Sequence, residues 1–115
     1  MDELSELLKG VLEGCVMQIL LHEPSYGYQI VRALNRAGFA SVSEGTVYPI
    51  LLRLKTRHLV DVSSKRSEVG PPRKVYALNA AGEAALDSFW QRWGFVAGCL
   101  QDIKENKIAQ EADHG

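Results

Sequence analysis

The sequence predicts a mainly α-helical protein with one small β-hairpin. Apolar residues recur every three or four positions in several segments, and two short alternating segments flank the turn-forming run EVGPP. One long helical pattern follows the second of these alternating segments. The 115 residues are 46% hydrophobic and 23% charged, which is the profile of an ordinary globular domain. We therefore expect a single core built mainly from helices.

The first expected helix covers residues 3–21. Leucine, valine, isoleucine and cysteine recur there at spacings of three and four, as is typical of a largely buried helix. Gly10 and Gly14 lie four residues apart in this helix. Either they allow another helix to approach closely, or they are tolerated at some cost in helix stability.

A short second helix is expected after Ser25, which is placed to cap it. Its apolar stripe consists of Ile30, Val31 and Leu34. Gly38 offers the left-handed conformation that commonly ends a helix.

The third expected helix begins after Ser43, whose side chain is suited to accept the first free N–H groups. Pro49 lies in its second turn, where it removes one backbone hydrogen bond and crowds the carbonyl group of Gly45, a residue that tolerates local distortion. The spacing of Val47, Ile50, Leu51 and Leu54 indicates one buried face. Pointing away from that face are Thr46, Pro49, Arg53 and Thr56, with Tyr48 at the flank.

After this helix, residues 59–67 and 73–79 alternate as two strands, with Tyr76 and Leu78 on one side and basic residues on both arms. Asn79 can cap a final helix over residues 80–106. Its apolar positions recur at intervals of four, three, four and three residues: Phe89, Trp93, Val96, Leu100 and Ile103.

Three helices, a basic hairpin and a long last helix make a winged helix-turn-helix with a C-terminal extension. In that arrangement the third helix enters the major groove of DNA and the wing lies along the backbone. We divide the chain into a winged helix-turn-helix DNA-binding domain (1–79, including the N-terminal helix), a C-terminal dimerisation helix (80–107) and a frayed tail (108–115).

Charge is distributed unevenly along the chain. The net charge is only −1, but residues 24–42 have a balance of +2 and residues 43–76 one of +4, between ends with balances of −4 and −3. A basic middle segment suits a nucleic-acid partner, although a charge run is often only a solvated face.

Other function classes find little support in the sequence. Histidine, serine and cysteine show no catalytic spacing and no glycine-rich phosphate loop is present, so we expect no enzyme activity, no metal and no other cofactor. Cys15 and Cys99 lie far apart, and we interpret both as small core residues. The apolar run GVLEGCVMQILL is too short to span a bilayer and lacks the pattern of a signal, which predicts a cytoplasmic protein with no membrane partner.

Three segments together resemble the PadR family of bacterial transcriptional regulators. PSYGYQIVRAL, SEGTVYPILLRL and GPPRKVYALNAAG stand in the family's order and at its distances, and the resemblance extends from about Leu7 to Leu86. It implies a short-tailed, homodimeric repressor whose third helix and wing bind a roughly palindromic operator and whose final helix dimerises. The sequence departs from the family at His58, where glycine is common, and at Asn79, where threonine is usual. Histidine can adopt the left-handed conformation and asparagine can cap a helix, so neither departure threatens DNA binding.

Within this interpretation the expected DNA contacts fall in two groups. Arg53 suits guanine or phosphate, hydroxyl groups suit phosphate oxygens, and wing charges suit backbone contact independent of base sequence. The alternatives are that Ser43 only caps, Tyr48 only packs, and the arginine and the wing are solvated. The candidates are Ser43, Thr46, Tyr48, Pro49 and Arg53 on the third helix, and Lys65, Arg66, Arg73 and Lys74 on the wing.

The final helix carries the candidate dimer and effector residues. Trp90 and Trp93 would bring indole rings together near a dimer axis, and facing aromatic surfaces can hold a planar hydrophobic or cationic ligand. Similar tryptophans line a drug-binding cavity in some short-tailed PadR-like regulators, which makes Trp93 the leading effector contact by resemblance. The alternative is that both indoles simply fill the dimer core. The full set is Phe89, Trp90, Trp93, Val96 and Leu100.

The predicted function is sequence-specific transcriptional regulation by a homodimeric repressor that a small aromatic or hydrophobic effector relieves. The alternative from another class is a winged-helix protein–protein interaction module that does not bind DNA, which a net charge near zero permits. Steeply salt-dependent binding to duplex DNA would separate the two.

Overall fold

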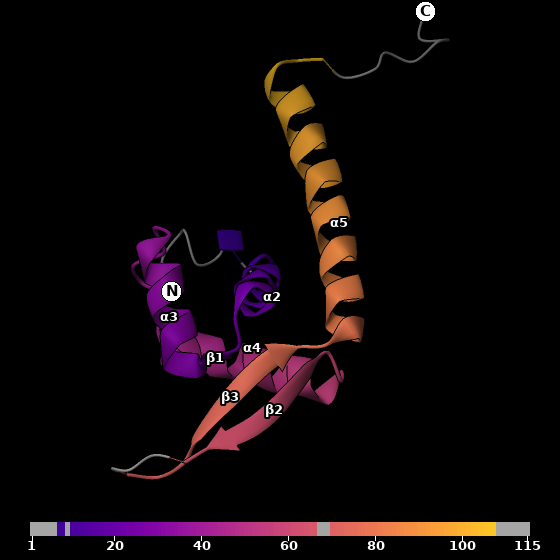
Figure 1. Ribbon diagram of the computed structural model, residues 1–115. Coiled ribbons are helices and arrows are strands. Elements are labelled where there is room, and N and C mark those ends of the chain that lie inside the picture. Colours follow the sequence, from indigo (N-terminus) through magenta and orange to yellow (C-terminus); the bar gives the residue numbers. More distant parts are fainter. Residues whose placement is uncertain (1–6, 9, 67–69, 108–115) are drawn as a thin grey trace, which may run out of the picture.

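The computed structural model describes residues 7–8, 10–66 and 70–107 of the chain (Figure 1). Within these ranges the predicted fold class is confirmed: helices dominate, one hairpin forms the wing, and a long helix follows it. The elements are α2 (Leu12–His22), β1 (Ser25–Tyr26), α3 (Gly27–Arg36), α4 (Glu44–Thr56), β2 (Val60–Lys65), β3 (Arg73–Leu78) and α5 (Ala80–Lys104).

The first predicted helix is interrupted at Gly10, so the prediction of one helix over residues 3–21 was wrong. Leu7 and Leu8 are helical, but Gly10 has a φ of 85° in a turn and α2 begins only at Leu12. Glycine reaches this left-handed region without a Cβ penalty, which lets the chain turn despite the continuous apolar spacing. Residues 3–6 and 9 of the predicted helix lie outside the described residues.

The start of α3 also differs from the prediction, because Ser25 does not cap it. Ser25 instead pairs opposite Tyr76 in the two-residue strand β1, which the sequence pattern did not reveal. The first turn of α3 is held by Gln29, whose Oε1 accepts the backbone N–H of Tyr26 at 2.8 Å. The end of α3 is as predicted, since Gly38 follows it with a φ of 121°.

The buried face of α4 forms as predicted, and the helix continues through Pro49 without a break. Its four apolar residues are at most 5% exposed. Ser43 occupies the N-cap position, but its hydroxyl makes no capping hydrogen bond. The backbone carbonyl of Ser43 accepts the N–H of Thr46 at 3.0 Å, and this N–H is one of the two donors that a capping hydroxyl could use. One core cluster joins α4 to the other helices and the sheet, and its members include Leu12, Val16, Met17, Leu20, Ile30, Leu34, Tyr76, Leu86 and Phe89.

The three strands form an antiparallel sheet in the order β1-β3-β2, and the β2–β3 hairpin is the wing. His58, between α4 and the wing, has a left-handed φ of 60°, as the family resemblance implied for this position. Asn79 then caps α5, because its Oδ1 accepts the N–H of Gly82 at 2.8 Å. Its Nδ2 donates to the carbonyl oxygen of His58 at 3.0 Å, so one side chain ties both ends of the wing together.

The N-terminal half of α5 packs against α2, and the rest of α5 extends past the other helices (Figure 1). Gly14 permits this packing: a Cβ at this position would lie 2.2 Å from the Phe89 ring. Trp90 adds a hydrogen bond from its Nε1 to Oε1 of Gln18 at 2.8 Å. Of the two alternatives for the paired glycines, close approach of a helix is therefore correct for Gly14, whereas Gly10 makes a turn.

We predict that Gly14→Ala lowers the free energy of unfolding by about 1–2 kcal/mol, because overpacking against Phe89 outweighs the better helix propensity of alanine. Urea denaturation measures the change. Phe89→Leu removes most of the obstructing ring, so in that background the alanine should cost clearly less. An equal cost in both backgrounds would contradict the assigned contact.

Candidate nucleic-acid interface

α3, α4 and the wing surround a hollow of about 610 Å³, which we call the tyrosine hollow. It brings together members of the two predicted groups, because Tyr48 comes from α4 while Arg73 and Lys74 come from the wing. Its lining is aromatic and basic with one acid: Tyr26, Tyr28, Glu44, Tyr48, Pro72, Arg73, Lys74 and Tyr76.

The position of Tyr48 depends on a residue that lacks a side chain. A Cβ on Gly27 would lie 2.8 Å from the Tyr48 ring, so the ring rests against the bare backbone at the start of α3. Tyr48 is still 45% exposed and contributes to the lining of the hollow. Burial, and secondly the nearby Tyr48 phenol, raise the pKa of Tyr76 above its usual value.

Strand pairing fixes the wing relative to α3. Tyr26 pairs with Val75 in the β1–β3 ladder, and the guanidinium carbon of Arg73 lies 5.6 Å from the centre of the Tyr26 ring. A cation over an aromatic face at this distance is attracted by the ring quadrupole. Tyr26 and Tyr28 were missed as site residues, and the only sequence signal was the segment YGY next to the predicted second helix.

The four predicted wing residues are exposed and lie on both arms of the hairpin. Lys65 of β2 is directly opposite Arg73 of β3, Lys74 is opposite Ser64, and Arg66 follows the end of β2. Like charges directly opposite in an antiparallel pair destabilise the sheet. An anion held against Lys65 and Arg73 would relieve that repulsion.

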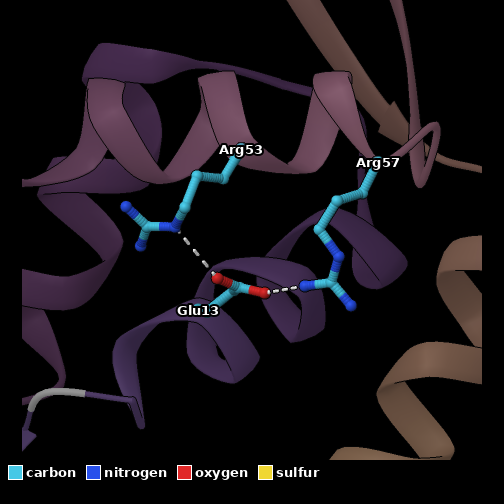
Figure 2. Close-up of polar contacts among 3 residues, drawn as sticks. All are labelled: Glu13, Arg53 and Arg57. Carbon is cyan, nitrogen blue, oxygen red and sulfur yellow. Dashed lines mark hydrogen bonds and ion pairs between the residues drawn. The ribbon is translucent and has the colours of Figure 1, made fainter.

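The exposed side of α4 carries one contact that was not predicted, at Arg53. Ser43 and Pro49 are exposed and Thr46 is half-buried. Arg53 is exposed and points away from the apolar stripe as predicted, but it also reaches α2, where its Nε donates to Oε2 of Glu13 at 3.3 Å (Figure 2). A helical wheel shows the direction of a side chain but not the neighbouring helix, and α2 lies beside this flank of α4.

Glu13 also binds Arg57, the residue that follows α4. Arg57 Nη1 donates to Oε1 of Glu13 at 2.5 Å, so one carboxylate bridges two guanidinium groups (Figure 2). Both bonds are charge-assisted, and both arginine side chains remain more than half exposed. The pair of bonds fixes α4 against α2.

We predict that Glu13→Gln lowers the free energy of unfolding by about 1 kcal/mol at low salt, and by less at high salt, because screening weakens exposed ion pairs. Chemical denaturation at two salt concentrations measures the difference. Asp87→Asn removes the same charge from an exposed position on α5 and should change stability little. Equal losses in the two variants would contradict the bridging role of Glu13.

The predicted dimer and effector residues fall into two environments. Phe89 is only 9% exposed and lies in the core of its own chain, because Gly14 admits its ring, so it is not available to a second chain. Trp90 and Trp93 are each 40% exposed, and Val96 and Leu100 are more so.

The cysteine prediction was correct for one residue and wrong for the other. Cys15 is half-buried beside the core, and burial raises the pKa of its thiol. Cys99 is exposed in the C-terminal half of α5. The helical spacing alone did not show that α5 extends beyond the core.

Two absences hold for residues 7–8, 10–66 and 70–107. No group of three or more histidine, cysteine, aspartate or glutamate side chains is placed to hold a metal ion. No helix there has the length and apolar content needed to cross a membrane.

Helices α3 and α4, the short strand β1 and the projecting hairpin define a winged helix-turn-helix protein with a long C-terminal helix. Residues 16–88 match the family described as the transcriptional regulator PadR-like family. Because this match covers more than half of the chain, the protein belongs to the PadR-like family of transcriptional regulators, a family whose members are not enzymes.

Similar proteins agree with this assignment. The transcriptional regulator Rv3488 of Mycobacterium tuberculosis is 43% identical over 61 residues, which cover 53% of this chain and 55% of that protein. The crystal structure of a PadR-like transcriptional regulator from Bacillus cereus is 42% identical, with a TM-score of 0.75, and the match covers 85% of this chain and 95% of that one. The structure of Bacillus subtilis PadR in complex with operator DNA has a TM-score of 0.63 at 21% identity, covering 70% and 46% of the two chains, and supports the fold.

Proposed function

We propose that the protein is a sequence-specific, homodimeric DNA-binding repressor. The observation that carries this proposal is the tyrosine hollow, which gathers hydroxyl groups and cations from three parts of the fold around one space. Hydroxyl groups and cations are the groups that proteins use most against phosphate oxygens. The Bacillus subtilis relative of the same fold was crystallised on operator DNA, which supports the same partner for this chain.

In the proposed complex, α4 enters the major groove and the wing follows the backbone. Tyr48 and Pro49 are exposed on α4, Thr46 lies in its first turn and Ser43 precedes it as the N-cap. Ser43 can offer its hydroxyl group because the helix start does not use it. Arg53 engages Glu13 through Nε alone in the described contacts, so its two terminal amino groups are the part that a base or a phosphate can bind.

The wing residues of the proposed complex are Lys65, Arg66, Arg73 and Lys74, which bind phosphates regardless of base sequence. The wing residues therefore contribute to affinity for any duplex, and the α4 residues contribute to sequence specificity. Loss of a wing charge should weaken binding to every duplex, whereas a change on α4 should act on the preferred sequence.

The test is fluorescence anisotropy with the duplex upstream of the protein's own gene and with a scrambled duplex, across a salt series. We predict selective binding whose logarithmic salt slope is several units. Lys74→Gln should reduce the slope by about one unit for each phosphate that the lysine neutralises, and should weaken both duplexes alike. Lys104→Gln, which removes the same charge from the end of α5, is the matched control and should leave the slope unchanged.

Weak and salt-insensitive binding to every duplex would sink the proposal. The winged-helix protein-interaction module would then become the better explanation of the same fold. Selective binding with an unchanged slope in Lys74→Gln would keep the DNA partner and remove Lys74 from the contact surface.

The proposed dimer forms through the C-terminal half of α5. This segment exposes large apolar residues that the described part of the chain leaves uncovered, and such patches on soluble proteins mark interaction sites. A second copy of α5 offers the same apolar surface and satisfies the two-fold symmetry of a palindromic site. The exposed residues are Trp93, Phe95, Val96, Leu100 and Ile103.

We predict that the protein sediments as a dimer and that Leu100→Asp shifts it to the monomer, because a carboxylate in an apolar interface loses its hydration without gaining a partner. Leu52→Asp is the matched control: Leu52 is 65% exposed on α4, and its replacement should leave the dimer intact. A dimer that persists in Leu100→Asp would place the interface elsewhere.

The same dimer would bring Trp90 and Trp93 of both chains near its axis, which supports a site for a planar hydrophobic or cationic effector that relieves repression. Trp90 is partly committed to Gln18 through its hydrogen bond, whereas Trp93 has no such bond among the described contacts. Titration of tryptophan fluorescence with planar ligands distinguishes an open site from indoles that only fill the interface.

A further inference from the structure

A basic groove lies on the side of α3 between this helix and the end of α2. Its volume is about 460 Å³, and Tyr28 lines both this groove and the tyrosine hollow. Beyond Tyr28 the groove carries Arg32, Arg36 and His22, with the acid Glu23 also in its lining. None of these residues belongs to α4 or to the wing, so the groove extends the basic surface past both.

We propose that Arg32 of α3, held in place by Tyr28, binds a backbone phosphate of duplex DNA and so acts as an anchor for the duplex. This inference rests on the proposed function, because it needs DNA to lie across the tyrosine hollow. Tyr28 borders that hollow together with Arg73 and Lys74, so a strand that follows the hollow arrives at Arg32 next.

The side chain of Arg32 is already oriented in the free protein. Its Nη1 donates to the hydroxyl oxygen of Tyr28 at 2.9 Å, and its guanidinium carbon lies 5.7 Å from the centre of the same ring. The two residues are four positions apart and therefore share one face of α3. A hydrogen bond and a cation–π contact together reduce the rotamer freedom that binding would otherwise remove, which favours phosphate binding. Nε and Nη2 remain for the phosphate oxygens.

The charge of Arg32 is also not compensated by an ion pair, in contrast to the charges of Arg53 and Arg57. Arg53 and Arg57 share the carboxylate of Glu13, whereas Arg32 has no carboxylate within 4 Å among the described residues. Residues 24–42 contain two arginines and no acid. The neutral Tyr28 hydroxyl orients the guanidinium group without cancelling its charge, so the charge is available to an anion.

The experiment measures the salt dependence of duplex binding by Arg32→Gln, with the upstream and the scrambled duplex as probes. We expect the logarithmic slope to fall by about one unit for each Arg32 that contacts a phosphate, with equal weakening for both sequences. Tyr28→Phe keeps the ring but removes the hydroxyl group, and should weaken binding less than Arg32→Gln. Circular dichroism and thermal unfolding verify that each variant is folded.

Arg36→Gln is the matched control, because it removes the same charge from the same helix and the same groove without touching Tyr28. An equal effect of the two variants would show a diffuse electrostatic field and overturn the proposal, as would an unchanged slope in Arg32→Gln. A site for free phosphate would instead show saturable binding of inorganic phosphate that Arg32→Gln abolishes, with no change in the slope for DNA, and this would also overturn it. If the wild-type protein binds no duplex, the proposed function itself has failed. If it binds the duplex and Arg32→Gln binds equally well, only the proposed phosphate contact of Arg32 is refuted.

Discussion

The close contact between Gly14 of α2 and the Phe89 ring of α5 determines how the long C-terminal helix leaves the rest of the molecule. Only a residue without a side chain lets the ring lie against the α2 backbone. The neighbouring residue, Glu13, faces α4 and binds Arg53 and Arg57. One turn of α2 therefore holds α5 on one side and α4 on another. The angle between these two helices depends on how well that turn is packed.

This arrangement matters for the two-fold dimer on DNA that we propose. In such proteins the two reading helices are spaced by about 34–36 Å, one turn of the double helix, or a multiple of it. If α5 carries the dimer interface, the spacing is set by the path from α5 through α2 to α4. A rigid path keeps the two α4 helices in register with the DNA. A ligand that moves α5 relative to α2 would also affect the position of α4, because Glu13 connects α2 to α4.

Four arginines of the winged helix-turn-helix fall into two groups by their contacts. Those on the α2 side of α4 pair with Glu13 and stabilise the packing of helices. Arg32 on α3 and Arg73 on the wing lie over tyrosine rings instead. Because the net charge of the chain is only −1, the basic character of the proposed DNA-facing side comes from this local arrangement and not from the total.

Periodicity and the backbone preferences of single residues were enough to predict the buried face of α4, the position of the wing, and the local conformations at Gly38 and Asn79, whereas the left-handed conformation at His58 was implied by the family resemblance. Both kinds of signal are local, so they can be read without knowing the rest of the fold. The candidate site was predicted in part, since Tyr48, Arg73 and Lys74 do meet in one hollow, whereas Tyr26 and Tyr28 were missed.

Only the tertiary structure shows which segment of the chain packs against each face of a helix or strand. It pairs Ser25 with Tyr76 in a strand of two residues, too short for any alternation to show. It turns Arg53 toward Glu13, 40 residues away in the chain, and it buries Phe89 in its own core while leaving Cys99 and Leu100 exposed. The spacing of apolar residues indicates that a face is buried but not by what, because the partner depends on contacts between distant segments and on how far one helix extends beyond another.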